Sequence, residues 1–548
     1  MTPNNAALPG VGFFHKTLSH DMTTGLVDPV AFTKFQKICS TGGDFADVPQ
    51  TTGAAKLVNP RGGWAHDGNL GPDPRQMSMP DPPSALSDGT AAEMTELYWM
   101  ALLRDKPFAS FSDADADIQQ AVVDMQAAFN RGAGSVIPCV DVPPVLNAQN
   151  VFRAGLPGED KGPLVSQFFL NDIAYGTQVI LQKQYPYKAG VNYLETWDSW
   201  LHAQNTGTGD DNKDYPNDNT GAPYYEADYR DPTKPGALKR IRNMRDLARF
   251  VNKDALHQAY FNAALLLNNW GAPVGKGNPY GNGRITNQLG FGTLGGPHLL
   301  ALVSEVAARA LRIVWHQKWG VYLRQRPEAY GGLMEAQRKG TAIGLPDWVF
   351  TTDGAKAIFD RTLADGSKPQ NFLLPLAFSA GSPDHPAYGA GHATVAGACV
   401  TILKAWFNGS AKMSDVVKGQ VHPVTGAPGR LVAPDIDGSD VLPEYMGADA
   451  AYLTVEGELN KLAANVALGR SMGGVHWRTD NTRSLRLGEK IATIILRRES
   501  MDYDEAPFWQ YRNFDGNMVE VRPDGRVLVS GDGELTDFYN DPDFDPIR

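Results

Sequence analysis

Two stretches of the chain combine histidine and arginine with glycine in a pattern suited to holding an oxyanion. The first runs from His385 to His392 and ends in a Gly-Ala-Gly-His turn, and the second, from Gly469, contains Arg470 and His476. Each lies beside an expected helix, whose N-terminal amides can bind negative oxygens. A guanidinium adds fixed charge, while one imidazole can bond the central atom and another can move protons. The combination predicts a pocket for a tetrahedral oxyanion.

Further cations stand upstream at a regular spacing. Lys318 ends an expected amphipathic helix, and Arg326 follows eight residues later, directly before Pro327. Taken singly, a basic residue at a helix C-terminus usually just complements the helix dipole. Taken singly, the turn before His392 is also explained by glycines that relieve a tight bend and a histidine that caps it. Only the ordered combination is specific.

The elements that must position these residues are mostly helices. Thr90 to Glu93 reads as a capping box that begins a helix through Leu103. Alternation from Met518 to Val529, with a Pro-Asp-Gly turn, predicts a β-hairpin. Apolar periodicity predicts the other helices at Asp113–Asn130, Leu194–His202, Met244–Leu267, Pro297–Trp315, Ala393–Phe407, Leu459–Met472 and Thr482–Arg498.

The predicted organisation is one large helical domain preceded by an irregular segment. Residues 1–90 are rich in Pro, Gly and Asp and are expected to wrap the body. Residues 91–548 show neither an internal repeat nor a clear linker. The site blocks within them are 315–327, 385–392 and 469–480, and Asp480 is expected to cap the following helix.

Composition sets limits on function. The chain has 548 residues, 42% of them hydrophobic, and a net charge of -11, which argues against nonspecific binding to nucleic acid or anionic membranes. A cationic site must therefore be local. Three scattered cysteines exclude a disulfide framework or a zinc cluster.

The first residues show neither a basic nor an apolar signal region, so the expected protein is soluble, and cytoplasmic by default. The most apolar run, Leu299 to Trp315, carries Glu305, Arg309 and Arg312 and is expected to be an amphipathic helix rather than a membrane span.

The segment 206–232 is rich in Gly, Asp and Asn. A surface loop is the favoured interpretation, and a structural calcium site is the alternative, because hard cations prefer carboxylate and carbonyl oxygens. Its spacing fits no EF-hand. The acidic tail, Asp532 to Asp545, is likewise interpreted as a solvated surface.

The order Lys-x7-Arg-Pro, small-Gly-His and Gly-Arg-x5-His-x3-Asp resembles the signature of the vanadium-dependent haloperoxidases and of their relatives, the type 2 phosphatidate phosphatases. The resemblance is closest to bromoperoxidases of red algae and cyanobacteria. It extends to the segments Asn59–Gly63, Gly71–Pro74, Glu96–Asp105 and Ser382–Pro386, and so covers most of the chain. It implies a mainly α fold, with helical bundles of the vanadium haloperoxidase and type 2 acid phosphatase type and a small β-hairpin near the C-terminus.

The resemblance also implies how one vanadate per subunit would be held. His476 would be the metal ligand. Lys318, Arg326 and Arg470 would bind the oxygens of the vanadate, and the amide of Gly391 would add a further hydrogen-bond donor.

The remaining roles concern catalysis and the halide. His392 would be the acid–base residue, with Lys318 polarising the bound peroxide. His385 matches a histidine typical of the bromoperoxidases, and Trp315 matches a tryptophan near the halide side. Asp254 would correspond to an acid that pairs with the pocket arginine. A histidine among cations should also have its charged form disfavoured, so the sequence predicts a neutral acid–base residue.

The implied activity is oxidation of bromide and iodide by hydrogen peroxide to hypohalous acid, which halogenates an organic acceptor; chloride should react poorly. Homo-oligomers from dimer to dodecamer are implied. Two positions depart from the family pattern. Ala390 stands where a serine would donate to vanadate, a loss of roughly 0.5–1.5 kcal/mol, and Gly469 stands where the phosphatases have serine.

Two alternatives stay open on the sequence. A phosphohydrolase could use the same pocket, with a phosphohistidine at His476 and His392 protonating the leaving group. The long spacing from Gly391 to Arg470 and the presence of His385 count against it. The other alternative is a non-enzymatic oxyanion-binding or structural oligomer with a degenerate site. The presence of all five charged or imidazole residues counts against it.

Overall fold

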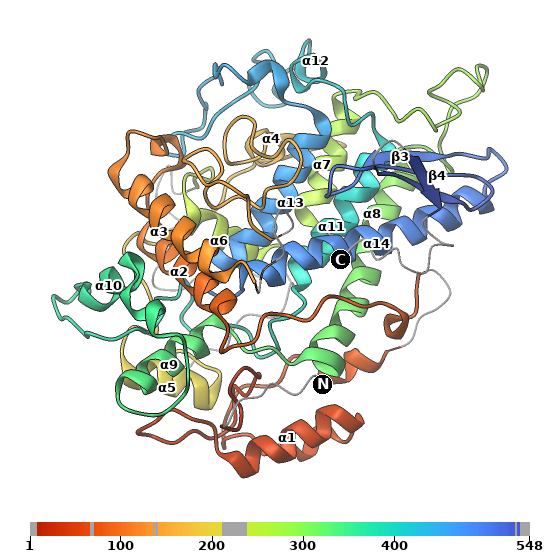
Figure 1. Cartoon of the computed structure of the whole chain (residues 1–548). Coiled ribbons are helices and arrows are strands. Elements are labelled where there is room, and N and C mark those ends of the chain that lie inside the picture. Colours follow the sequence, from red (N-terminus) through yellow and green to blue (C-terminus); the bar gives the residue numbers. More distant parts are fainter. Residues whose placement is uncertain are drawn as a thin grey trace.

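The structure is a computed structural model that describes residues 8–65, 71–134, 136, 141–210, 238–531 and 534–537. It is mostly α-helical, with small antiparallel sheets at the surface, as the sequence predicts (Figure 1). The helices are α1 Pro29–Thr41, α2 Asp88–Leu102, α3 Ala116–Gly132, α4 Gln167–Leu170, α5 Trp197–Thr206, α6 Met244–Lys253, α7 Gln258–Asn269, α8 Gly296–His316, α9 Pro327–Arg338, α10 Asp353–Asp360, α11 Gly391–Trp406, α12 Met413–Val417, α13 Val455–Met472 and α14 Arg478–Asp502. The strands are β1 Ile173–Tyr175, β2 Gln178–Ile180, β3 Trp509–Arg512, β4 Met518–Val521, β5 Val527–Gly531 and β6 Glu534–Asp537.

Helix α11 lies at the centre of the bundle and packs against α8, α13 and α14 (Figure 1). Almost every one of its residues is buried, so it is apolar on all sides rather than amphipathic. Gly397 of α11 and Gly488 of α14 lie so close to the partner backbone that a Cβ on either would collide with it. This close approach fixes the two helices that carry His392 and follow His476.

One predicted helix is divided in two. The periodicity from Met244 to Leu267 predicts continuous helix, but the structure has α6 and α7, separated at Asp254–His257. Asp254 is extended, with φ -67° and ψ 144°, and ends α6. The interruption turns its carboxylate toward the site described below.

The predicted capping box at Thr90 is wrong. Helix α2 begins earlier, with Ser87 as the N-cap whose Oγ accepts from the Thr90 amide at 3.3 Å. Glu93 is instead fully buried and accepts from the amide and hydroxyl of Thr479 at 2.6 and 2.7 Å. The carboxylate of Glu93 thus binds Thr479 of α14 instead of capping the start of its own helix.

Helix α14 also begins earlier than predicted, at Arg478 rather than Thr482. Asp480 lies in its first turn, where Oδ2 accepts from the N-cap amide of Trp477 at 3.0 Å. Asp480 therefore stabilises the helix start as expected, but from inside the helix.

The N-terminal segment contains a helix that is not predicted from the sequence. Helix α1 starts after Asp28, whose carboxylate accepts from the Ala31 amide at 2.7 Å, and Pro29 occupies its first position. Phe32 and Phe35 pack from it into a small core with Trp319. The rest of residues 8–65 is irregular with short 3₁₀ turns, whereas a domain boundary at residue 90 stays a prediction.

The predicted hairpin is confirmed and is larger than expected. Strands β4 and β5 pair through a turn at Pro523–Gly525 and form the middle of a four-stranded sheet in the order β3-β4-β5-β6. Within the described residues no helix has the length and apolar character needed to cross a membrane. Most of the acidic loop 206–232 and of the tail Asp532–Asp545 lies outside the described residues, and within the described part no group of three or more His, Cys, Asp or Glu could hold a metal ion.

Candidate active site

The predicted cations and two of the predicted histidines meet in one buried site. Burial holds the pKa of His476 well below its ordinary value, and the nearby cations and a second imidazole lower it further. Burial and the same positive charges act on the lysine, whose pKa is also well below its ordinary value. Hydrogen bonds from Lys318 to the carbonyl of Pro386 and from Arg326 to the carbonyls of His385 and Val475 show that three separate site blocks converge. The residues brought together are Lys318, Arg326, His385, Arg470 and His476.

Lys318 lies in a π-helical turn, Gln317–Tyr322, that continues α8. Its Nζ donates to the carbonyl oxygens of Pro386 and Ala387 at 2.7 and 3.1 Å and lies 5.7 Å from the ring centre of Trp315. The side chain is fully buried. The ammonium group is therefore fixed against the loop that carries His385.

Arg326 is the N-cap residue of α9, directly before Pro327. Its Nε donates to the carbonyl of His385 at 3.0 Å, and Nη1 donates to the carbonyl of Val475 at 2.6 Å. One guanidinium thus joins the 385–392 block to the 469–480 block. Arginine carries only donors, which sets the direction of these bonds.

His385 is oriented by the same guanidinium. Nδ1 of His385 lies 3.0 Å from Nη2 of Arg326 and 3.2 Å from the carbonyl oxygen of Pro386. Because the guanidinium can only donate and makes the shorter contact, we assign Nδ1 as the acceptor and the ring proton to Nε2. Burial, then Lys318 and Arg326, hold the pKa of His385 well below its ordinary value, which keeps the ring neutral. The ring centre lies 4.9 Å from that of Trp315. The two predicted halide-side residues are therefore neighbours.

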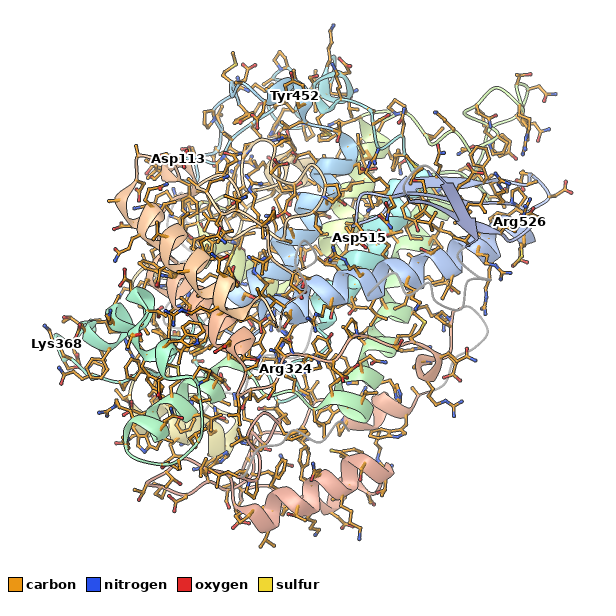
Figure 2. All side chains as sticks on the ribbon, in the orientation of Figure 1. Asp113, Arg324, Lys368, Tyr452, Asp515 and Arg526 are labelled. Atoms are coloured by element: carbon orange, nitrogen blue, oxygen red, sulfur yellow. The ribbon has the colours of Figure 1, made fainter. Side chains whose placement is uncertain are left out.

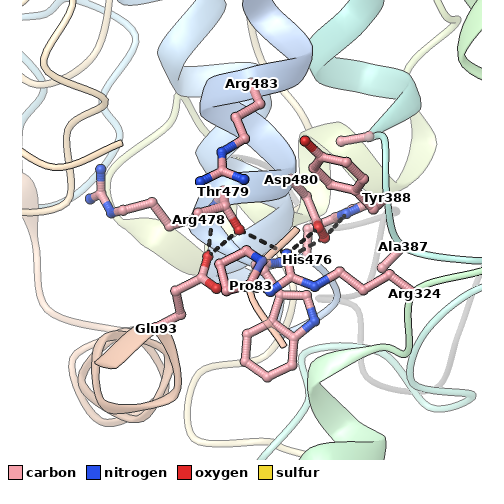
Figure 3. A network of polar contacts seen from close by, with 12 residues as sticks. Pro83, Glu93, Arg324, Ala387, Tyr388, His476, Arg478, Thr479, Asp480 and Arg483 are labelled. Carbon is pink, nitrogen blue, oxygen red and sulfur yellow. Dashed lines mark hydrogen bonds and ion pairs between the residues drawn. The ribbon is translucent and has the colours of Figure 1, made fainter. Parts of the chain in front are cut away.

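His476 is held by a carboxylate. Its Nδ1 lies 2.9 Å from Oδ2 of Asp480, and because a carboxylate only accepts, Nδ1 carries the proton and Nε2 keeps its lone pair (Figure 3). A histidine that binds metal through one nitrogen commonly donates the other ring N–H to a carboxylate. The geometry of His476 is therefore suited to binding a metal through Nε2.

The carboxylate is in turn part of a buried charged network (Figure 3). Arg324 donates from Nη1 to Oδ1 of Asp480 at 2.7 Å and from Nη2 to Glu93 at 2.9 Å. Its guanidinium lies 5.1 Å from the ring centre of Trp477. In Figure 2, Arg324 lies inside the body of the molecule, whereas Lys368 and Arg526 lie at its edge.

Arg324 and Glu93 were not selected from the sequence. The only local signal for Arg324 is its position two residues before Arg326, and Glu93 looked like part of a helix cap. Asp480 and Glu93, the two partners of Arg324, lie 156 and 231 positions away from it in the sequence. Sequence spacing alone carries no information about such contacts.

The N-terminus of α11 closes another side of the site. Its N-cap is Ala390, which offers no side-chain hydrogen bond to the first-turn amides. A Cβ on Gly391 would lie 3.7 Å from the ring of Trp315 and 3.5 Å from Leu311. The first turn of the helix thus lies against Trp315 and Leu311.

The end of α6 links His392 to the arginine of the pocket. Nε2 of His392 lies 3.0 Å from Oδ1 of Asp254, and Nη1 of Arg470 donates to the carbonyl of Val251 at 2.6 Å. Asp254 therefore contacts His392, the predicted acid–base residue, and its predicted pairing with the pocket arginine stays a prediction.

Known proteins resemble this chain over most of its length. It is 33% identical to a vanadium-dependent bromoperoxidase of Corallina pilulifera over 95% of this chain and 92% of that protein. It is 32% identical to proteins of the same description from Corallina officinalis, covering 95% of this chain and 92% of that protein, and from Ascophyllum nodosum, covering 96% and 89%. The chain belongs to the vanadium-dependent bromoperoxidase family.

Two further comparisons agree. The family model described as the VCPO second helical-bundle domain matches residues 298–504, which include every site block. The homohexameric structure of the second vanadate-dependent bromoperoxidase from Ascophyllum nodosum superposes with a TM-score of 0.80 at 31% identity, covering 96% of this chain and 86% of that chain. These relatives confirm the predicted family and mainly α fold, and they do not favour the phosphohydrolase alternative.

Proposed function

We propose that this protein is a vanadate-dependent bromoperoxidase that uses hydrogen peroxide to oxidise bromide and iodide to hypohalous acid. One observation carries the proposal. Three buried cations, Lys318, Arg326 and Arg470, lower the pKa of the His476 imidazole, whose Nδ1 contacts a carboxylate, so that Nε2 keeps its lone pair for a ligand bond. Such a set fits a tetrahedral oxyanion that also accepts one nitrogen ligand.

The residues present fit vanadate in charge and in donor type. Nε2 of His476 would form the bond between the protein and the metal. Lys318, Arg326 and Arg470 would balance the charge of the oxygens, and the amide of Gly391 at the start of α11 would add a neutral donor. Vanadate bound there supplies Lewis acidity toward peroxide.

The side chains supply binding and proton transfer. Because Nε2 of His392 lies against Asp254, Nδ1 is the ring atom available to exchange a proton with the pocket. Asp254 holds that ring in one orientation. Lys318 is immobilised by two carbonyl oxygens and can donate a third N–H into the site. Fixed donors of this kind stabilise developing charge without reorganisation.

The halide side is assigned to Trp315 and His385. The two rings are in contact, and Nε2–H of the neutral imidazole is a donor of the kind an anion would meet. We expect bromide and iodide to react readily and chloride poorly. Hypohalous acid would then halogenate an organic acceptor, free or bound.

We also propose that the protein is a homo-oligomer, since the Ascophyllum nodosum structure is homohexameric. A structural calcium ion has no support among the described residues.

The function is tested by halogenation after metal removal. The protein is treated with EDTA and assayed for peroxide- and bromide-dependent bromination of monochlorodimedone, before and after vanadate is added. We expect activity to be restored by vanadate and not by phosphate. Absence of bromination in protein that has bound vanadate would overturn the proposal, and hydrolysis of p-nitrophenyl phosphate as the main activity would replace it.

A further inference from the structure

We propose that the N-terminal strap, residues 10–20, is a structural part of the active site, with Lys16 as the positioning residue for the loop 380–387 that carries His385. The position of that loop can be tested without any assumption about function. The predicted effect on halide use rests on the function proposed above.

Lys16 reaches the loop directly. Its Nζ donates to the carbonyl oxygens of Ala380 and Ser382 at 2.7 and 2.6 Å and lies 3.0 Å from Oε1 of Glu328. All three N–H donors of the ammonium therefore have acceptors. The side chains of Lys16 and Glu328 are 2% and 1% exposed. A lysine buried this deeply contacts its three partners inside the protein and has no role at the surface.

Glu328 connects this contact to the vanadate side. It lies in the first turn of α9, two residues after Arg326, and its Oε2 accepts from the Ser382 amide at 2.7 Å. Gly381 has a positive φ of 69°, and a Cβ there would collide with the carboxylate of Glu328. The loop is thus seated tightly on the lysine–glutamate pair.

The strap also pairs with the segment that follows Lys318. The Phe14 amide donates to the carbonyl of Leu323 at 2.6 Å, and the Gln325 amide donates to the carbonyl of Gly12 at 3.0 Å. Oε1 of Gln325 accepts from the Gly12 amide at 3.2 Å. Backbone bonds thus join the strap to the chain between two of the three pocket cations.

The two segments held by the strap are bonded to each other inside the site. The Ala387 amide donates to the carbonyl of Arg324 at 2.9 Å, and Arg326 donates to the carbonyl of His385 at 3.0 Å. Lys318 closes the same loop from the other side through Pro386. Removing Lys16 leaves the far end of the loop without its ammonium donor, so His385 and its carbonyl should lose their fixed position.

The test variant is Lys16→Met, which keeps the length of the side chain and removes its donors. Because it would leave Glu328 buried without its counter-charge, it should destabilise the protein. The double variant Lys16→Met/Glu328→Gln removes both charges and still lets the glutamine oxygen accept from Ser382. Comparison of the two separates loss of loop position from loss of stability.

A matched control is Lys461→Met. Lys461 is also fully buried, and its Nζ contacts Glu458 and the carbonyl of Lys161, each at 2.5 Å. It lies on α13, nine positions before Arg470, and contacts neither the strap nor the loop in the interactions seen here.

The first measurement is hydrogen exchange of the amides in 380–387 in protein without vanadate. We expect faster exchange in both Lys16 variants and wild-type exchange in this loop for Lys461→Met. The second measurement is bromide kinetics, where we expect the KM for bromide to rise roughly tenfold in the double variant, with kcat affected less, because small displacements of positioned groups have effects of this size or larger.

Wild-type exchange in 380–387 in the double variant, or the same change in Lys461→Met, would overturn the inference. If the wild-type protein fails to oxidise bromide, the proposed function fails, and the exchange experiment still decides the role of Lys16.

Discussion

Two histidines of the site, His476 and His385, are held by different kinds of contact. The ring of His476 is fixed by a chain of buried side-chain charges: Asp480 in the first turn of α14, then Arg324 in the segment before α9, then Glu93 of α2. His385 lies in a loop whose backbone carbonyl oxygens are bound by cations. The position of His476 thus depends mainly on a few buried side chains, together with the bond from Arg326 to the Val475 carbonyl. The position of His385 depends on the path of the backbone, and so on every segment that contacts it.

The largest expected effect separates the two histidines. His476→Ala should abolish vanadate binding because it removes the proposed metal ligand, whereas His385→Ala should bind vanadate and lose halide oxidation. Equilibrium dialysis with vanadate, at wild-type helix content by circular dichroism, measures the first part. Equal loss of vanadate in both variants would break the comparison.

Acid should weaken the side of the molecule that contains the N-terminal strap. His15 and His20 are buried with their ring nitrogens 2.9 Å apart; burial lowers the pKa of His20 to about 4 and that of His15 well below its ordinary value. Between pH 6.5 and 4 the unfolded chain takes up protons that the folded chain does not. The contribution of these imidazoles to the free energy of unfolding should therefore fall as the pH drops through this window, by about 3 kcal/mol for His20 alone at its lower end, and this contribution should not change above it.

Urea unfolding at a series of pH values measures this loss. The comparison is with His20→Asn, which has no proton to take up at this position and should lose less stability between pH 6.5 and 4. Parallel curves for the two proteins would show that these imidazoles do not cause the acid sensitivity.

On the metal side, Asp480→Asn should weaken vanadate binding about 10–100-fold, since it removes the charged acceptor that holds Nδ1–H of His476. The matched control is Asp141→Asn, another fully buried carboxylate that pairs with an arginine of α14, Arg483, at 2.9 Å. Loss of stability without loss of vanadate affinity is expected for the control. The same loss of affinity in both would show that burial of charge, not the bond to His476, is responsible.

The smallest expected effect is a gain. Ala390→Ser would add a hydroxyl at the N-cap of α11 and should strengthen vanadate binding by about 0.5–1.5 kcal/mol if the hydroxyl reaches an oxygen. Ala393→Ser, in the first turn of the same helix, controls for the added hydroxyl. Titration of each with vanadate compares the two, and no difference between them would mean that the missing serine is unimportant here.

The sequence predicted the elements that carry strong periodicity and the residues that carry an ordered motif. Most predicted helices are found close to their expected bounds, and Lys318, Arg326, Arg470 and His476 converge as expected. The break between α6 and α7 was missed because apolar residues continue on both sides of it. Periodicity reports which face is buried, and it does not report where a chain must leave the helix to reach a partner.

Long-range contacts set the limit for the site as well. Glu93, Arg324 and Lys16 are ordinary charged residues in sequence, and their roles come from partners that only the fold brings near. The irregular appearance of the first 90 residues concealed the strap, because its backbone bonds to the 323–325 segment leave no pattern in the sequence.

The π-helical turn at Gln317–Tyr322 has a consequence for anyone who wishes to change the enzyme. Such a turn contains one more residue than an α-helical turn, and each residue rotates the chain by roughly 100° about the helix axis. Deletion of Gln317 should let α8 run on as a regular helix and rotate the ammonium group of Lys318 out of reach of the Pro386 carbonyl. Designs that shorten the chain should therefore avoid this turn and the segment 323–326, which carries Arg324 and Arg326.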